Sequence, residues 1–240
     1  MQAIRTKSKS LLQVGWRLAK AAVGRDVSHR ADVRLPSERY GGAYGGWVVY
    51  TQSLASDSIV YSCGVGEDAG FDLALMSTFG MTIHAFDPTP RAVEWINEQD
   101  LPSTFCFHQI GISDFDGTAT FNAPERPDHA SYTLVKDRGN AAFAVEAEVR
   151  RLSTIMNDFG HDHIDLLKID IEGAEYDVVD DLTSSELEIR QLLVEFHHGF
   201  GSIGVKETSR AVALLRTHGY RLFHVSPRGE EYSFIHRDHV

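Results

Sequence analysis

Carboxylate and imidazole side chains follow two predicted β-strands at the point where each strand ends. Asp170 and Glu172 come at the end of one strand, and Glu195, His197 and His198 come at the end of the next. Catalytic groups of open α/β sheets lie past the carboxyl ends of the strands, so adjacent strands would bring the two sets together. Two kinds of chemistry stay open for this cluster. Either Asp170, Glu195 and His197 bind Mg²⁺ or another divalent cation, or one histidine acts as a general base.

Neighbouring residues limit these assignments. Side chains alternate between the two faces of a strand, so at most one of His197 and His198 acts directly. Glu175 lies in the first turn of a predicted helix, where we interpret its charge as favourable to the helix dipole. For Lys168, inside an apolar strand, an ion pair with Asp170 and a contact with the substrate are both open.

A glycine turn lies between an apolar run, Ile59–Tyr61, and a helical pattern that ends at Gly80. Gly64 and Gly66 let the chain approach a ligand without a side chain in the way, and the unpaired amides of the helix start face the same crevice. Asp87 follows the next strand, 21 residues beyond Gly66, close to the spacing at which a carboxylate binds ribose hydroxyls. The spacing therefore predicts a nucleotide-type cofactor site.

The residues after the turn favour one cofactor. Glu67 and Asp68 stand at the helix entrance, and Ala69 takes the place where a dinucleotide motif has its third glycine. Two carboxylates would repel a pyrophosphate, whereas an amino acid that carries a sulfonium would accept them. We therefore expect S-adenosylmethionine rather than NAD.

Strand and helix patterns alternate from residue 59 onward, which predicts an α/β, Rossmann-like fold. We expect a seven-stranded, mostly parallel sheet with one antiparallel strand near its edge. The predicted strands are Ile59–Tyr61, Met81–Phe86, Thr104–Ile110, Ile164–Asp170, Leu192–Phe196, Tyr220–Val225 and Tyr232–His236. The predicted helices are Phe71–Phe79, Pro90–Gln99 with Thr89 as its cap, Leu152–Phe159, Gly173–Leu182 and Lys206–His218.

A glycine-rich segment precedes the first of these strands. Leu35–Trp47 holds four glycines and two tyrosines, so we predict a loop that leads into a strand at Trp47–Tyr50. Whether this loop covers the site or only connects elements stays open.

The segment from Gly111 to Leu152 also breaks the alternation. We predict a hairpin that turns at Asp116 and Gly117, followed by a polar loop over Pro124–Asn140. We expect this loop to contribute to substrate binding.

The chain has 240 residues, 42% of them hydrophobic, which is enough for one α/β domain with a large core. We expect no membrane span and no signal peptide, because no apolar run approaches about 18 residues. Two cysteines, Cys63 and Cys106, do not make a disulfide framework, and they fit a cytoplasmic location. The net charge of −11 argues against a nucleic-acid partner, since a phosphate backbone is bound by a basic surface.

The charge is unevenly placed along the chain. Residues 1–30 carry seven Lys or Arg against one Asp, a net charge of +6 that leaves −17 for the remainder. We assign residues 1–35 to a basic N-terminal helix or tail and residues 36–240 to the main domain. Two interpretations of the basic segment stay open: weak contact with an anionic membrane surface, or packing against the acidic domain, which we favour.

The segment Ile164–Val178, IDLLKIDIEGAEYDV, resembles the hallmark of the FkbM-type methyltransferases, which are class I S-adenosylmethionine enzymes. Their sequences typically show a nearly identical Lys-Ile-Asp-x-Glu-Gly-x-Glu run. Supporting matches are the glycine turn, AFDP at Ala85–Pro88, Gly111 with Ser113, and VEFHH at Val194–His198. The similarity covers Ser58 to His198.

This resemblance implies methyl transfer to oxygen, commonly to a hydroxyl of a sugar, a glycoconjugate or a related natural product. One departure stands at Ser62, because class I enzymes usually have an acidic residue two places before the first glycine. On this interpretation Glu67 or Asp68 takes over the contact with the methionine end. We place the cofactor contacts at Ser62, Cys63, Gly64, Gly66, Glu67, Asp68, Asp87, Gly111 and Ser113.

We therefore expect an S-adenosylmethionine-dependent O-methyltransferase that acts on a small-molecule or carbohydrate acceptor. Methylation of a hydroxyl calls for a base, or for a metal that acidifies the hydroxyl, and Asp170, Glu172, Glu195 and a neighbouring histidine are the candidates. Two other function classes stay open: a nicotinamide-dependent oxidoreductase on a similar sheet, and a non-catalytic binding domain that kept the fold. A homo-oligomer also stays open.

Overall fold

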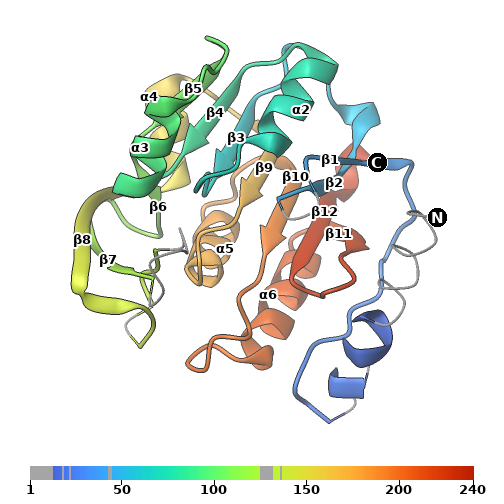
Figure 1. The fold of residues 1–240 in the computed structure, drawn as a ribbon. Helices are drawn as coiled ribbons and strands as arrows, with labels where there is room; N and C mark the ends of the chain where they lie inside the picture. The colour runs from blue at the N-terminus through green and yellow to red at the C-terminus, as the bar shows by residue number, and fades with distance from the viewer. Residues whose placement is uncertain (1–12, 18, 22, 43–44, 125–131, 136) are drawn as a thin grey trace, which may run out of the picture.

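The computed structural model describes residues 13–17, 19–21, 23–42, 45–124, 132–135 and 137–240, arranged around a seven-stranded sheet (Figure 1). The strands of this sheet are β3 (Val60–Cys63), β4 (Ile83–Phe86), β5 (Phe105–His108), β9 (Ile164–Ile169), β10 (Ile189–Glu195), β11 (Tyr220–Val225) and β12 (Glu231–His236). The helices are α2 (Gly70–Phe79), α3 (Pro90–Glu98), α4 (Leu152–Phe159), α5 (Glu175–Ser184) and α6 (Val205–Thr217), with short 3-10 helices η1 (Thr51–Ser53) and η2 (Arg237–His239).

The strands follow the order β11-β12-β10-β9-β3-β4-β5 across the sheet. Strand β12 runs antiparallel to both of its neighbours, and the other pairs are parallel. The predicted fold class, a mostly parallel sheet with one antiparallel strand, is confirmed. The chain moves outward from β3 to β5 and then returns to β9 on the other side of β3. The carboxyl ends of β3 and β9 therefore flank the switch point at which such sheets bind ligands.

Apolar side chains fill both faces of the sheet. Helices α4, α5 and α6 pack on one face, where Leu182 and Leu215 are buried. Helices α2 and α3 cover the other face together with β2 (Trp47–Tyr50), where Leu75 and Trp47 are buried. Every residue of β3 and β9 is buried, as expected for central parallel strands that are covered on both sides.

Local signals fix the ends of the helices. Thr89 accepts a hydrogen bond from the amide of Ala92, and Pro90 follows at the first position of α3. Gly80 takes a φ of +73° and ends α2, in the left-handed conformation that glycine adopts without strain. The two ends are therefore where the sequence predicted them.

The segment from Gly111 to Leu152 forms a separate three-stranded sheet, but the predicted hairpin was wrong. Its strands are β6 (Gly111–Ile112), β7 (Gly117–Ala123) and β8 (Asn140–Arg150), with β8 in the middle. Strand β7 pairs antiparallel with β8, and β6 pairs parallel with β8. Asp116 accepts hydrogen bonds from the Arg151 amide at 2.9 Å and the Thr154 hydroxyl at 2.8 Å. Its carboxylate therefore binds polar groups at the start of α4. Within the predicted polar loop, residues 125–131 and 136 lie outside the described residues.

The glycine-rich segment contains a strand that the sequence prediction missed. Strand β1 (Ser37–Tyr40) pairs antiparallel with β2, which was predicted. The four residues of β1 precede Gly41, so the glycines that argued against a regular element lie in the connection between the two strands. Residues 43 and 44 of that connection lie outside the described residues.

The described part of the N-terminal segment packs beside β11 and β12 (Figure 1). Residues 13–17 and 19–21 are helical, and the buried guanidinium of Arg17 donates to the Ser226 carbonyl at 2.9 Å. Asp32 then forms an ion pair with Arg216 at 2.9 Å. Trp16 remains 68% exposed, and contact with a membrane surface stays a prediction. Among the described residues, no helix combines the length and the apolar character that crossing a membrane requires.

Candidate functional site

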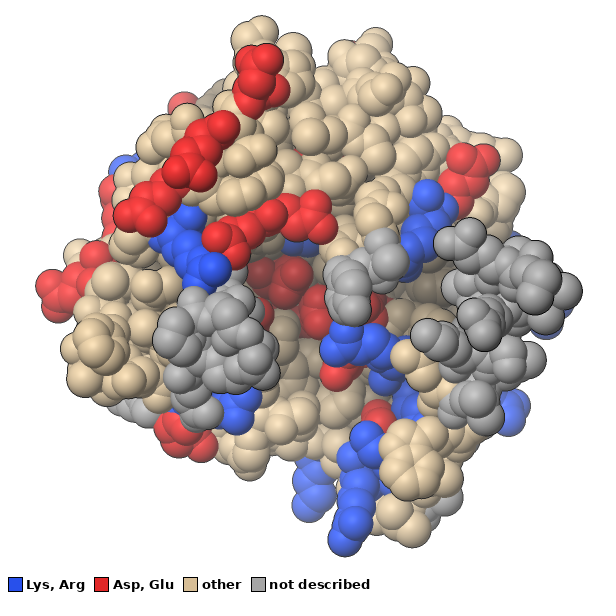
Figure 2. Space-filling view, in the orientation of Figure 1, with Lys and Arg blue, Asp and Glu red and all other residues tan. Residues whose placement is uncertain are grey.

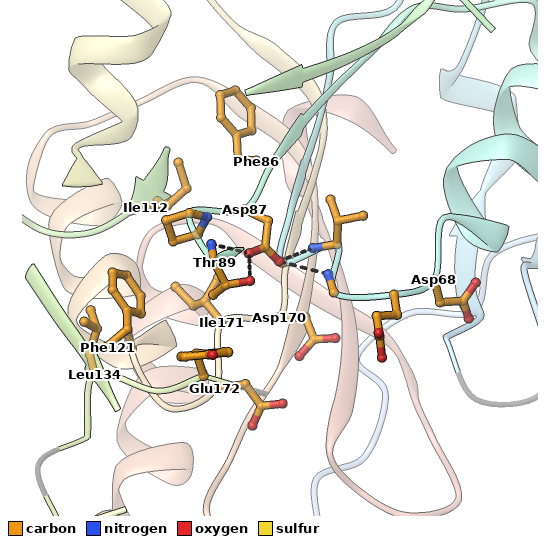
Figure 3. A pocket seen from close by; sticks show the side chains of 18 residues that line it. Asp68, Phe86, Asp87, Thr89, Ile112, Phe121, Leu134, Asp170, Ile171 and Glu172 are labelled. Carbon is orange, nitrogen blue, oxygen red and sulfur yellow. Dashed lines mark hydrogen bonds between the residues drawn. The ribbon is translucent and has the colours of Figure 1, made fainter. Parts of the chain in front are cut away.

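A cavity of about 240 Å³ lies where the carboxyl ends of β3, β4 and β9 meet (Figure 3). Figure 2 shows Asp and Glu side chains in and around the central hollow of the molecule, and Lys and Arg side chains along its lower edge. Of the residues predicted from the sequence, the cavity brings together Gly64, Gly66, Glu67, Asp68, Asp87, Gly111, Asp170 and Glu172.

Two glycines shape the turn after β3, each for a different reason. Gly64 has a φ of +83°, and a Cβ at this position would lie 1.7 Å from the carbonyl oxygen of Asp170. Gly66 has a φ of +55°, and nothing described lies within 4 Å of the place that its Cβ would take. Gly64 therefore lets β3 and β9 approach each other, while Gly66 leaves the cavity open towards a ligand.

Asp87 holds the glycine turn through both of its carboxylate oxygens. One oxygen accepts hydrogen bonds from the amides of Val65 and Gly66, at 3.1 and 2.9 Å. The other accepts from the amide and the hydroxyl of Thr89, at 2.9 and 2.6 Å (Figure 3). A carboxylate offers about four lone-pair sites, so these bonds use all of them. Contact of Asp87 with ribose hydroxyls stays a prediction, whereas its support of the turn is visible.

Lys168 supports the same turn from the neighbouring strand. Its ammonium donates to the carbonyl of Gly64 at 2.6 Å and lies 3.8 Å from the carboxylate of Asp170. The ion pair that the sequence left open is therefore present. The contact with the backbone of the turn was missed, because a carbonyl group carries no residue-type signal. The only available hint was a charged residue within an apolar strand.

One side of the cavity is apolar. Phe86, Ile112, Phe121 and Leu134 lie there, as Figure 3 shows. Gly111 is packed so closely that a Cβ at its position would lie 3.1 Å from the Phe121 ring. A flat, largely apolar ring such as a nucleobase is well buried against a wall of this kind.

Glu67 and Asp68 line the cavity beside the glycine turn, where the sequence placed them. Glu67 forms an ion pair with Arg91 at 2.9 Å. Asp68 accepts a hydrogen bond from the amide of Gly70 at 2.7 Å, at the start of α2. Each carboxylate thus has a partner within the chain, and their contact with a methionine end stays a prediction.

Asp170 and Glu172 lie after β9, on the side of the cavity away from Phe121 (Figure 3). Burial raises the pKa of Asp170, while the positive charges of Lys168 and His197 act in the opposite direction. Glu172 has a φ of +55°, a conformation that residues with side chains rarely adopt. This sharp turn between β9 and α5 leaves both carboxylates at the cavity wall.

Glu175 is the centre of a buried network, although its sequence position suggested only a helix-dipole role. The side chain is fully buried, and its carboxylate accepts hydrogen bonds from the amides of Ile171 at 3.0 Å and Gly173 at 3.1 Å. It also lies 2.9 Å from Nδ1 of His197. Glu175 therefore ties the turn after β9 to the residues that follow β10.

His197 lies between two carboxylates. Its Nδ1 faces Glu175 at 2.9 Å, and its Nε2 faces Glu172 at 3.3 Å. Burial lowers the pKa of His197, but the carboxylates of Glu175, Glu172 and Asp170 outweigh burial and raise it well above its usual value. The ring is held as a cation in this arrangement, so it is not a free general base.

Glu195 and His198 are not among the described residues that line the cavity. Burial raises the pKa of Glu195 to about 8, and the negative charge of Asp170 adds to this effect. His198 lies 3.3 Å from Asp26 of the N-terminal segment, away from the partners of His197, as strand alternation predicted. The catalytic roles predicted for these two residues stay predictions.

Three predicted cofactor residues are buried and are not among the described residues that line this cavity. Ser62 and Cys63 lie within β3, and Ser113 follows β6. Burial raises the pKa of the Cys63 thiol to about 12, so the thiol stays neutral. Ser113 donates a hydrogen bond to Asp114 at 3.1 Å. These positions suit support of the wall, and direct contact with a cofactor stays a prediction.

The metal site predicted at Asp170, Glu195 and His197 has a different composition in the structure. Among the described residues, Asp170, Glu175 and His197 each bring one donor atom within 4.8 Å of the other two. Glu175 thus takes the place predicted for Glu195. Both ring nitrogens of His197 face carboxylates, and a protonated ring offers no lone pair to a metal. The contacts of His197 are thus those of a ring paired with two carboxylates, and they do not support a divalent cation.

Several known proteins are similar in sequence to this domain. The family described as the methyltransferase FkbM domain matches residues 35–222. A Homo sapiens protein named "Probable methyltransferase-like protein 24" is 27% identical over 175 residues, which cover 69% of this chain and 42% of that protein. The 31-O-demethyl-FK506 methyltransferase FkbM of Streptomyces tacrolimicus is 26% identical, over 64% of this chain and 71% of that protein. Methyltransferase sdnD of Sordaria araneosa is 26% identical, over 53% and 64% respectively.

The chain covers less than half of the human relative, at 42% of its length. The family match nevertheless includes the whole candidate site, from the glycine turn to the end of β10. The match therefore favours a methyltransferase over the nicotinamide-dependent oxidoreductase that the sequence had left open as a function class. The chain belongs to the FkbM methyltransferase family, a family of S-adenosylmethionine-dependent enzymes, as the motif at Ile164–Val178 had implied.

Proposed function

We propose that this chain transfers a methyl group from S-adenosylmethionine to a hydroxyl oxygen of a sugar, a glycoconjugate or a related natural product. One observation carries the proposal: Asp170 lies in the wall of the same cavity as the glycine turn. Burial raises the pKa of this carboxylate. The name of the Streptomyces tacrolimicus relative refers to an O-demethylated substrate, which supports an oxygen acceptor.

The two sides of the cavity match the two ends of the methyl donor. The apolar side, with Phe86 and Ile112, suits the adenine ring, and the open space at Gly66 admits the chain that follows it. Glu67 and Asp68 offer negative charge to an ammonium group. When bound, S-adenosylmethionine supplies an electrophilic methyl group on a positively charged sulfur.

Asp170 is the candidate general base. Its carboxylate accepts the proton of the acceptor hydroxyl, which makes the hydroxyl oxygen a stronger nucleophile. A raised pKa suits this role, because a base is most effective when its pKa lies near the working pH. The positive charges of Lys168 and His197 act on the same carboxylate and offset the negative charge that gathers beside it.

This chemistry does not depend on a divalent cation. A cluster of carboxylates would require a cation to relieve repulsion, but Lys168 and His197 already supply positive charge there. We therefore expect EDTA to leave the activity unchanged. Loss of activity in EDTA, with recovery in Mg²⁺ or Mn²⁺, would show that a metal acidifies the hydroxyl.

Calorimetry tests the cofactor first. We expect S-adenosylhomocysteine to bind and NAD not to bind. Binding of NAD without S-adenosylhomocysteine would contradict the proposal at its first step.

Labelled S-adenosylmethionine and a panel of hydroxylated acceptors then test the reaction. Asp170→Asn should lower turnover about 10²–10⁴-fold, with affinity for S-adenosylhomocysteine close to that of the parent. Asp57→Asn, at an exposed position, is the matched control. Binding of S-adenosylhomocysteine without transfer to any acceptor would instead support a non-catalytic binding domain.

A further inference from the structure

A buried carboxylate lies close to the glycine turn and has no part in the chemistry above. Asp72 belongs to the first turn of α2 and is 2% exposed. Among the described residues, neither its Oδ1 nor Oγ of the fully buried Ser62 has a partner at hydrogen-bond geometry, although Ser62 is near enough to Asp72 to lower the pKa of its carboxyl. A buried charge of this kind is unfavourable unless an opposite charge lies near it.

Lys168 provides the opposite charge. Burial raises the pKa of Asp72 to about 6, and the positive charge of Lys168 acts against burial. The Lys168 ammonium is itself buried, where it donates to the carbonyl of Gly64 at 2.6 Å and lies 3.5 Å from the carbonyl of Cys63. The ring of Trp47 lies 5.9 Å from the ammonium and helps to exclude water. Asp170 lies 3.8 Å from the ammonium and provides one negative charge at the end of β9, and the buried Asp72 provides a second from α2.

We propose that Asp72 is a positioning residue for the methyl donor: its carboxylate balances Lys168, which holds the glycine turn in the form that receives the cofactor. This inference rests on the proposed function, since it takes the turn to be the binding site of S-adenosylmethionine. It requires a second negative charge near Lys168, in addition to that of Asp170, whichever element supplies it.

Ser62 offers a way to separate the charge from the local structure of α2. In the parallel pair of β3 and β9, Ser62 stands opposite Lys168. Paired residues of parallel strands project to the same face, so a carboxylate at position 62 would also lie beside the lysine. Ser62→Asp combined with Asp72→Ser keeps the net charge and moves the carboxylate from α2 to β3.

A pH profile gives a second readout. The titratable groups around Asp72 and Lys168 are Asp68 in the turn, Cys63 on β3 and Asp170 at the end of β9. With a pKa of about 6, Asp72 takes up a proton as the pH falls through this value. The affinity of the parent for S-adenosylhomocysteine should therefore decrease between pH 8 and pH 5, and Asp72→Asn should lack this step.

The experiment compares the parent, Asp72→Asn and the double variant Ser62→Asp/Asp72→Ser. Calorimetry with S-adenosylhomocysteine measures affinity, and thermal unfolding measures folding. We expect Asp72→Asn to bind roughly tenfold more weakly at pH 8, as for the loss of one charge contact, and the double variant to recover most of the affinity. Such recovery would show that the carboxylate can act from β3 as well as from α2, so the place of Asp72 in the first turn of α2 is not what the cofactor needs.

Three outcomes have distinct meanings. Parent-like affinity in Asp72→Asn, or a folded double variant that binds no better than Asp72→Asn, would overturn the inference. If Asp72→Asn does not fold, the double variant decides: folding with binding supports the role of the charge, and failure to fold overturns it. A parent that does not bind S-adenosylhomocysteine would refute the proposed function itself, independently of Asp72.

Discussion

Exchange of Glu175 for glutamine should disrupt the network that holds the end of β9. In the parent, one buried carboxylate accepts hydrogen bonds from the amides of Ile171 and Gly173 and pairs with the His197 cation. Glutamine keeps the shape, but it turns one acceptor oxygen into a donor and leaves His197 without its nearest negative charge. Loss of one partner from a buried ion pair costs about 3–5 kcal/mol.

This free energy translates into a large change in Tm. For a domain of this size, about 1 kcal/mol lowers Tm by roughly 2–4 °C, so Glu175→Gln should lower it by roughly 10 °C. Differential scanning calorimetry at pH 7 measures the change, and Glu146→Gln at an exposed position of β8 is the matched control. Affinity for S-adenosylhomocysteine should fall as well, because Ile171 lines the cavity. A Tm within about 2 °C of the parent would refute the central role of the Glu175 charge.

Five further substitutions test other parts of the molecule. Gly64→Ala should abolish folding or cofactor binding, because no Cβ fits there, whereas Gly66→Ala meets open space and should cost only about 1–2 kcal/mol of stability in denaturant unfolding. Asp87→Ala should weaken calorimetric binding of S-adenosylhomocysteine by about 1–3 kcal/mol, and an unchanged affinity would rule out a role in holding the cofactor turn. Burial raises the pKa of Glu195 from 4.5 to about 8, so the folded parent should lose stability as the pH rises between these values. Glu195→Gln should therefore have the higher Tm above pH 8, and equal pH profiles would contradict this. The sign is opposite at His84, because burial lowers the pKa of its ring from 6.5 to about 4. The parent should therefore lose stability as the pH falls between these values. The Tm of His84→Phe should fall less over the same range.

Much of the fold could be predicted because its signals are local. Thr89 and Gly80 act on the helix ends beside them, so their effect is visible in the sequence alone. The pairing of β7 with β8 depends on segments that are separated along the chain. The turn signal at Asp116 could not show that its carboxylate bonds to the start of α4, and the predicted hairpin failed there.

The candidate site divides in the same way. Gly64, Gly66 and Asp87 line the cavity, as predicted. Their place could be predicted because the spacing of the motif follows the geometry of a strand, its turn and the next strand. Lys168 and Glu175 act on backbone carbonyl and amide groups of other segments. Every residue type except proline carries both groups, so no pattern of side chains could identify these partners.

The close approach of Gly64 to the Asp170 carbonyl brings two walls of the cavity into direct backbone contact. No methyl group fits between them, and Lys168 bonds to the Gly64 carbonyl across the same junction. The glycine turn after β3 and the end of β9 are therefore packed directly against each other. Tyr132 and Leu134, which lie between β7 and β8, belong to a different wall of the cavity. The spacing between the backbone of the glycine turn and the backbone of Asp170 is thus set by direct contact between β3 and the end of β9.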